Sequence, residues 1–353
     1  MNKLTKVGCS ALCGSLAAIA SANAGTLSVT GGADMTWISN GTAVTGNPLG
    51  MGSNYTLNGA GELDNGWAFS LAIANGNLRA YSATVINLDM GMLGSINFNS
   101  GNSGNGIAAI DDKMPTAWEE TWGAGVSTGV RLPLGSGSSQ NIQWKSPAYG
   151  DNGTYIALTH AHDYGSADIN DKATGSTEGD SADSSTDIVL NINPSLGTEI
   201  LSGLNIFGGA SQIKANAVGA TRDDIYEGVA GVTYDIGPLS LGAQWSADYT
   251  GIDAEHKGHA SNVYNLYKAV AYGVAFNVND DLSVSYGRWT ARKAGKTSTT
   301  TSTTNAEIDV TSAQIAYTMG GASIRIADTD AEDVSWSDGN NQSATTISLG
   351  LAF

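Results

Sequence analysis

Apolar and polar residues alternate along much of this chain with a period of two, which is typical of β-strands. The alternation is cleanest in the segments 27–37, 66–75, 239–249 and 270–278. The second face of these segments consists mostly of Ser, Gly, Ala, Asn and Thr, not of the Lys and Glu of a soluble surface. Trp and Tyr recur near the ends of the apolar face, where a lipid interface selects them. The pattern therefore indicates strands with lipid on one side and water on the other.

The whole chain divides into about sixteen such segments, each near the ~10 residues that a strand needs to cross an outer membrane. They cover 26–38, 52–62, 66–75, 80–90, 93–100, 140–147, 153–164, 186–193, 203–213, 225–236, 239–249, 265–278, 281–291, 307–319, 321–328 and 343–353. Tight turns alternate with longer polar connections. This arrangement predicts an all-β fold, a closed antiparallel transmembrane β-barrel with short periplasmic turns and long external loops. Closure also removes the exposed strand edges of an open sheet.

Two of the segments change the phase of their alternation. The change lies near Gly208 in 203–213, and between Val310 and Ala313 in 307–319. A β-bulge would explain either change, and so would a wrong segment boundary.

The N-terminus has the pattern of a secretory signal peptide. Lys3 and Lys6 precede an apolar run, and an Ala-Asn-Ala sequence ends at Ala24. We therefore expect residues 1–24 to be a cleaved signal peptide and residues 25–353 to form the barrel. No later stretch approaches the ~20 apolar residues of a transmembrane helix.

Charge and cysteine content exclude some classes of partner and site. The formal net charge is −17, with 33 acidic and 16 basic residues, so we expect no nucleic-acid partner. Cys9 and Cys13 both lie in the predicted signal peptide, which leaves the exported chain without a disulfide or a cysteine metal site. We expect no cofactor.

The sequence does not favour an enzyme. A barrel hydrolase needs a Ser/His or Asp/His constellation, and the only candidates are His160 and His162 near Asp163 and Ser166. No G-x-S-x-G motif surrounds a serine. The same two histidines lack an obvious third ligand for a metal ion.

The last segment, 343–353, alternates up to its final residue. Its apolar positions Ile347, Leu349 and Leu351 are expected to face lipid. The opposite face, expected to be pore wall, consists of Ala344, Thr346, Ser348 and Gly350.

These features together resemble the general diffusion porins of Gram-negative outer membranes. The resemblance rests on the signal peptide, the alternating segments, an outsized loop after the fifth of them, and the ending Leu351-Ala352-Phe353. It implies an outer-membrane homotrimer in contact with lipid and lipopolysaccharide, and a water-filled channel for passive diffusion of small hydrophilic solutes and ions. It further implies that the third external loop folds into the lumen, and that Leu351 and Phe353 belong to a signal for the barrel-assembly machinery. The chain lacks the Pro-Glu-Phe-Gly-Gly signature of the enterobacterial loop.

The outsized loop, residues 101–139, carries most of the candidate chemistry. Its acidic residues are Asp111, Asp112, Glu119 and Glu120. If the loop folds inward, these carboxylates line the narrowest part of the channel. In a restricted aqueous pore they raise the local concentration of cations and oppose anions.

Few basic residues are expected on the wall that faces this loop. The alternation places Lys145 and Arg325 inward, is compatible with an inward Arg79, and places Arg288 at the outer rim. A thin basic wall favours weak to moderate cation selectivity. Two alternatives remain open: a substrate-selective porin, for which we find no line of inward aromatic residues and no arginine ladder, and a structural or adhesive barrel with a plugged lumen.

Acidic residues also gather in the segments 163–187 and 328–338, the first of which ends at Asp187. Carboxylate oxygens bind Ca²⁺, and the weak candidates here are Asp180, Asp183, Asp330 and Asp333. No segment matches an EF-hand loop, so solvated acidic loops are the favoured interpretation.

Overall fold

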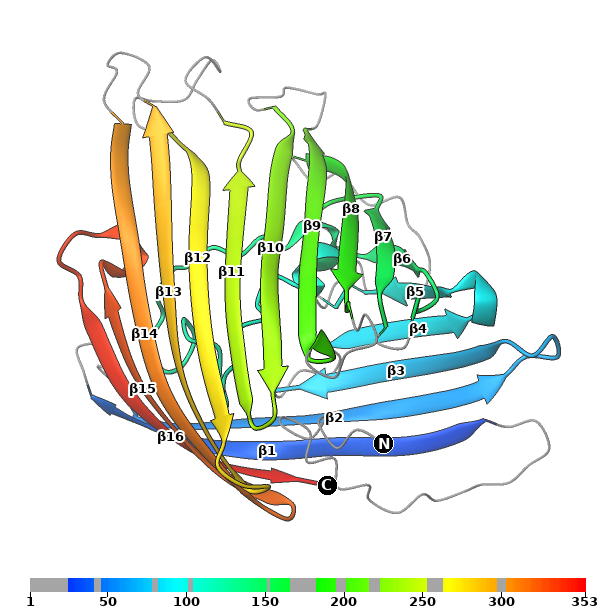
Figure 1. The fold of residues 1–353 in the computed structure, drawn as a ribbon, viewed down its shortest axis with the longest axis horizontal. Coiled ribbons are helices and arrows are strands. Elements are labelled where there is room, and N and C mark those ends of the chain that lie inside the picture. The colour runs from blue at the N-terminus through cyan, green and yellow to red at the C-terminus, as the bar shows by residue number, and fades with distance from the viewer. Residues whose placement is uncertain are drawn as a thin grey trace.

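The computed structural model describes residues 25–40, 46–77, 82–100, 104–150, 153–165, 182–194, 201–215, 223–252, 263–296 and 303–353. These residues form a closed barrel of sixteen antiparallel strands in which sequence neighbours pair and β1 pairs with β16 (Figure 1). The predicted barrel is therefore confirmed. The predicted signal peptide, Arg79 and Asp180 lie outside the described residues.

The strands follow the sixteen predicted segments in order. They are β1 (Thr26–Asn40), β2 (Leu49–Glu62), β3 (Ala68–Gly76), β4 (Ala83–Asp89), β5 (Ser95–Asn99), β6 (Asn141–Lys145), β7 (Tyr155–Ala161), β8 (Ala182–Ile192), β9 (Leu204–Ala215), β10 (Ile225–Ile236), β11 (Leu239–Tyr249), β12 (Val263–Asn277), β13 (Leu282–Lys296), β14 (Thr303–Met319), β15 (Ala322–Glu332) and β16 (Gln342–Ala352). The short 3₁₀ helices are η1 (Gly91–Leu93), η2 (Gly106–Ala109), η3 (Gly135–Ser138) and η5 (Val334–Trp336).

The outside of the barrel is apolar, as the alternation predicts. On β11, Leu241 and Trp245 are exposed, and on β16 the exposed side chains are Ile347, Leu349 and Leu351. Side chains of this kind recur around the barrel, and such a band suits a hydrocarbon environment. Among the described residues, no helix is long and apolar enough to cross a membrane.

The two phase changes are not bulges. The ladder of β9 is continuous over Ile206–Ile213, and that of β14 is continuous through Val310 and Ala313. Phe207, Ile213 and Val310 point inward and are almost fully buried. The phase changes because one part of each strand turns its apolar side chains to the outside of the barrel, whereas another part packs them against an apolar surface inside it.

That inner surface is the segment between β5 and β6. Its residues Ile107, Ile110, Met114 and Val126 form one buried cluster with inward side chains of β7–β10 and β12–β16. In Figure 1 the segment appears in teal behind β10–β13. The outsized loop therefore folds into the barrel, and the hydrophobic core lies between it and the wall.

Candidate functional site

Residues 104–140, here called the inner loop, run along the inside of the barrel and return. The outgoing limb is 104–121 and the return limb is 122–140. The loop starts in a network of amides, where Asn105 Nδ2 donates to Asn97 Oδ1 at 2.9 Å and to Asn141 Oδ1 at 2.7 Å. Gly106 N–H donates to Gln143 Oε1 at 3.0 Å.

Wall side chains hold the backbone of the outgoing limb. Lys113 N–H donates to Gln244 Oε1 of β11 at 3.1 Å. The N–H groups of Trp118 and Glu119 both donate to Gln314 Oε1 of β14, at 3.0 and 3.1 Å. Gln314 Nε2 donates back to the Glu119 carbonyl at 2.8 Å. A loop has no regular backbone ladder, so its buried N–H and C=O groups need other hydrogen-bond partners, which these wall side chains provide. The same bonds fix the acidic stretch in place.

Buried carboxylates hold the return limb. Gly135 N–H donates to Glu227 Oε2 at 2.7 Å, Ser136 N–H donates to Asp187, and Arg131 forms an ion pair with Asp248. Direct cross-strand pairs connect the three acids, from Asp187 through Ser211 to Glu227 and then Asp248. The return limb thus follows one row of inward residues.

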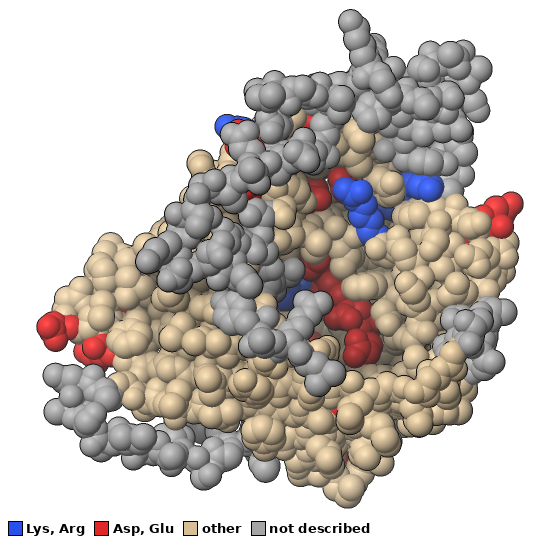
Figure 2. Space-filling view, turned by 180° about the vertical axis from the view of Figure 1, so that it is seen from behind, with Lys and Arg blue, Asp and Glu red and all other residues tan. Residues whose placement is uncertain are grey.

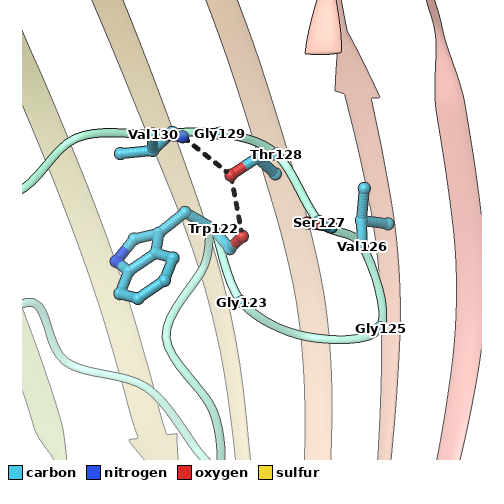
Figure 3. Close-up of a pocket in the computed structure, with 8 residues that line it drawn as sticks. All are labelled: Trp122, Gly123, Gly125, Val126, Ser127, Thr128, Gly129 and Val130. Atoms are coloured by element: carbon cyan, nitrogen blue, oxygen red, sulfur yellow. Dashed lines mark hydrogen bonds between the residues drawn. The ribbon is translucent and has the colours of Figure 1, made fainter. Parts of the chain in front are cut away.

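The turn between the limbs borders an open pocket of about 420 Å³, lined by Trp122, Gly123 and Gly125–Val130 (Figure 3). Thr128 Oγ1 donates to the Trp122 carbonyl at 3.2 Å and accepts from Val130 N–H at 3.3 Å. Beyond the turn, Ser335 N–H of η5 donates to the Thr128 carbonyl at 2.9 Å. The bend is therefore stabilised both internally and by the connection between β15 and β16.

The four predicted acids lie together on the outgoing limb. Burial raises the pKa of Asp111 to about 7, and burial followed by the charge of Glu120 raises the pKa of Asp112 to about 7. Burial and then Glu120 also raise the pKa of Glu119. Figure 2, which views the barrel from behind, shows acidic side chains gathered in its hollow beside basic ones. When these carboxyls are ionised, their shared negative charge in a confined space repels anions from the lumen.

The two predicted basic residues that the structure describes point inward, yet neither is an isolated wall charge. Arg325 forms an ion pair with Asp34, donates to Ser348 Oγ at 2.9 Å, and lies 5.1 Å from the centre of the Trp118 ring. Lys145 Nζ lies 3.8 Å from the centre of the Tyr155 ring. Arg325 therefore fixes the inner loop to the wall, a role that the alternation alone does not indicate.

Arg288 points outward as predicted and forms an ion pair with Asp309. The inward face of β16 is not open pore wall, however. Ala344, Thr346 and Ser348 are almost fully buried, because the inner loop near Gly125 and the Arg325 side chain cover them.

Inward aromatic rings are features that the sequence analysis missed. Besides the pairs at Trp118 and Tyr155, the Arg131 guanidinium lies 4.9 Å from the Tyr267 ring centre. Lys293 Nζ lies 5.2 Å from the ring centre of Trp336, which makes an edge contact with Tyr267. Strand parity identifies Tyr267 as inward, because Val270 and Tyr272 face out. The partner rings and cations come from distant segments, so no local pattern indicates the pairs.

The inner loop covers only part of the wall. The covered wall, defined as the inward faces of β8–β14, is buried over most of its middle, where residues such as Glu227, Gln244 and Trp289 meet the loop, and Asp235 near the β10–β11 turn is exposed. The open wall, defined as the inward faces of β1–β3, carries exposed small or polar residues such as Thr30, Asn54 and Ser70. The free lumen therefore lies between the acidic loop and a mostly uncharged wall.

The acidic residues considered for calcium do not form a cluster. Asp330 is exposed on β15, Asp183 is exposed on β8, and Asp333 Oδ1 accepts from Gly339 N–H at 2.7 Å. Within the described ranges, no group of three or more His, Cys, Asp or Glu side chains is placed to hold a metal ion.

No protein-family model and no curated protein matches the sequence. Solved structures do match. A porin structure superposes with a TM-score of 0.63 at 12% identity, over 93% of this chain and 100% of the other. The fold is that of a porin. The trimer form of OmpT, an outer membrane protein of Vibrio cholerae, gives a TM-score of 0.59 at 12% identity, covering 94% of this chain and 100% of the other. The anion-selective porin from Comamonas acidovorans gives 0.59 at 12% identity, covering 93% and 99%.

Proposed function

We propose that the protein is an outer-membrane porin, a water-filled channel for passive diffusion of small hydrophilic solutes and ions with weak to moderate cation selectivity. The observation that carries the proposal is the acidic stretch of the inner loop, which lies inside a closed barrel and leaves free lumen beside a mostly uncharged open wall. Asp111, Asp112, Glu119 and Glu120 form the negative side of the constriction.

The pairing of two inward arginines, Arg131 and Arg325, supports a preference for cations. The charges of Arg131 and Arg325 are paired with Asp248 and Asp34, so neither adds net positive charge to the lumen. Charge focused in a narrow aqueous channel raises the concentration of its counter-ion. Since one similar fold belongs to an anion-selective porin, the fold leaves selectivity to the side chains of the constriction.

A substrate-selective porin is the second candidate, and the inward pairs of rings and cations favour it. Rings such as Tyr267, Trp336 and Trp118 offer flat apolar surfaces next to charge. Such surfaces bind solutes that combine an apolar face with polar groups. A structural or adhesive barrel would instead conduct no ions. We infer that the protein is not an enzyme. In support, the exposed His160 ring hydrogen-bonds Thr186 Oγ1, and not the carboxylate or serine of a catalytic pair.

The remaining expectations belong to the same proposal. Residues 1–24 are removed on export, and the barrel forms homotrimers in contact with outer-membrane lipid and lipopolysaccharide. Leu351 and Phe353 are recognised by the barrel-assembly machinery. The position of Phe353 supports this role, since its backbone exchanges hydrogen bonds with Gly31 at the closing seam of the barrel while its side chain is exposed.

Planar-bilayer recordings of the purified protein test the proposal. We expect large ohmic conductance steps, grouped in threes for a trimer, and a reversal potential in a KCl gradient that shows K⁺ permeating faster than Cl⁻. An anion-favouring reversal potential contradicts the selectivity, and a protein that inserts without conducting contradicts the channel itself. Block of the current by one class of sugar or aromatic solute at low concentration would favour the substrate-selective candidate.

A further inference from the structure

Asp187 contacts both ends of the inner loop. It lies on β8, faces inward and is 1% exposed. Its Oδ2 accepts from Ile107 N–H at 3.0 Å, at the start of the loop. Both of its carboxylate oxygens lie 3.1 Å from Ser136 N, at the end of the loop, and Oδ1 also accepts from Ser136 Oγ at 2.8 Å. One carboxylate therefore joins two points of the chain that are separated by about 30 residues, a length at which closing a flexible segment is entropically costly.

The backbone is built to approach this carboxylate closely. Gly106 and Gly135 precede the two donor residues and have φ of +62° and +48°, in the left-handed region. A Cβ on either glycine would overlap Asp187 Oδ2. Glycine allows both the left-handed conformation and the close approach. A glycine therefore stands before each of the two residues that donate to Asp187.

The other anchors differ in reach. Gln244 and Gln314 bind only the outgoing limb, whereas Glu227 and Asp248 bind only the return limb. Two wall side chains tie the limbs to each other. One is Asp187 on β8, and the other is Asn141 of β6, whose Oδ1 accepts from Asn105 and whose Nδ2 donates to the carbonyls of Ser136 and Ser139. Asp187 is the charged one of the two, and hydrogen bonds to a charged group are the stronger ones. We therefore expect its loss to loosen the base of the loop more than the loss of an anchor that holds one limb.

We propose that Asp187 is the positioning residue that sets the width of the channel, by holding the two ends of the inner loop together so that the acidic stretch cannot move across the lumen. This role rests on the proposed channel function. We call Asp187, Ile107 and Ser136 the Asp187 junction. Asp187 lies behind the loop and does not line the free lumen, so it acts on solutes only through the loop.

Asp187→Asn tests the junction with little change in shape. The amide replaces one acceptor oxygen with an NH₂ group, which would meet an N–H donor and leave it buried without a partner. We expect the displaced loop to become at least about tenfold more populated, because a hydrogen bond to a charged group is worth that factor or more. In liposome-swelling assays the permeation rate of a trisaccharide should rise severalfold relative to a monosaccharide, and open-channel current noise should increase.

The matched control is Asp235→Asn. Asp235 is an inward carboxylate of β10 that accepts a hydrogen bond from Ser240 Oγ beside the tight turn between β10 and β11, and its backbone N–H donates to Gly203, so neither of these bonds holds the inner loop. The Asp235→Asn variant removes one wall carboxylate, as Asp187→Asn does, but breaks no hydrogen bond to the inner loop. It should therefore leave the trisaccharide-to-monosaccharide ratio and the current noise at wild-type values. An equal effect of both variants would mean that wall charge, and not the junction, controls the width.

A second pair of variants works from the loop side. Gly106→Ala should reproduce the effect of Asp187→Asn, because its Cβ pushes the loop off the carboxylate. Gly123→Ala is the control, since its Cβ would have its nearest neighbour, Glu120 Oε2, at an ordinary 3.6 Å. This pair decides the question if Asp187→Asn fails to assemble.

A reversible cross-link provides the rescue. Ser136 Oγ and Ser185 Oγ lie 2.9 Å apart, so cysteines at these positions are close enough for a disulfide. Ser136→Cys with Ser185→Cys in the Asp187→Asn background should restore the wild-type trisaccharide ratio when oxidised and lose it again on reduction. Wild-type behaviour of both Asp187→Asn and Gly106→Ala would overturn the inference. A wild-type protein that does not conduct would instead overturn the proposed function.

Discussion

The covered wall and the open wall are built from the same alternation but bury different residues. On the covered wall, Trp289 and Val310 are at most 1% exposed, and their neighbours are apolar or bind the inner loop. On the open wall, Thr30 and Ser70 are exposed and mostly uncharged residues surround them. The inner loop thus serves as a second layer for one side of the barrel only. The comparison shows that an inward residue of this barrel faces either water or the inner loop. Residues that face the loop are apolar or bind its backbone, and those that face water are small or polar.

The largest expected difference between the two walls is in how much a substitution lowers the free energy of unfolding. Ile107→Ala removes a fully buried loop side chain that packs in the shared cluster, and we expect the free energy of unfolding to fall by about 2–5 kcal/mol. Ser70→Ala on the open wall should change it by less than about 0.5 kcal/mol. Urea unfolding in lipid vesicles measures both. Equal losses would mean that the loop adds no packing of its own.

An intermediate effect is expected for ion selectivity when Arg325 is changed. This residue lies on β15, between the covered wall and the open wall. Arg325→Met leaves Asp34 and Glu119 without their nearby cation, so the K⁺/Cl⁻ permeability ratio should rise by a factor of about 1.4 to 5, which corresponds to the 0.2–1 kcal/mol of a partly exposed charge pair. Arg288→Met is the control, because it breaks an ion pair on the outer face. An unchanged or lower ratio for Arg325→Met would show that the carboxylates of Asp34 and Glu119 do not act on the permeating ions.

The smallest effect is expected from pH. Burial raises the pKa of Asp111 and Asp112 to about 7, so both carboxyls become neutral as the pH falls through that value. The K⁺/Cl⁻ permeability ratio should therefore decrease between about pH 8 and pH 6, a window that ordinary aspartates do not reach. Reversal potentials across that range provide the measurement. Asp111→Asn with Asp112→Asn should remove the pH dependence in this window, and a dependence that persists would assign it to other groups.

The strands can be located from the sequence because the signal that marks them is local. A residue that faces lipid is recognised by its own side chain and those two positions away, as in 225–236 and 239–249, which match β10 and β11 without any shift. The acidic residues of the inner loop were found for a similar reason, since they stand in one long connection. Their role at the constriction stays a prediction.

Strands in which two environments follow one another are where the sequence pattern misleads. The phase changes in β9 and β14 suggested bulges or wrong boundaries, because lipid was taken as the only apolar surroundings. Asp187 was grouped with an acidic loop, although it is an inward residue of β8. The difference is caused by the inner loop, which supplies apolar contacts and N–H donors to the inside of the barrel.

The sequence by itself determined the all-β class, the order of the sixteen strands and the face of most residues, because alternation depends only on neighbours along the chain. The tertiary structure alone decided which inward residues are open to water and which are buried. Arg325 meets Asp34 and Trp118, and Asp187 meets Ile107 and Ser136, only after the barrel closes and the inner loop enters it. These contacts join residues far apart in the chain, so no local pattern carries them.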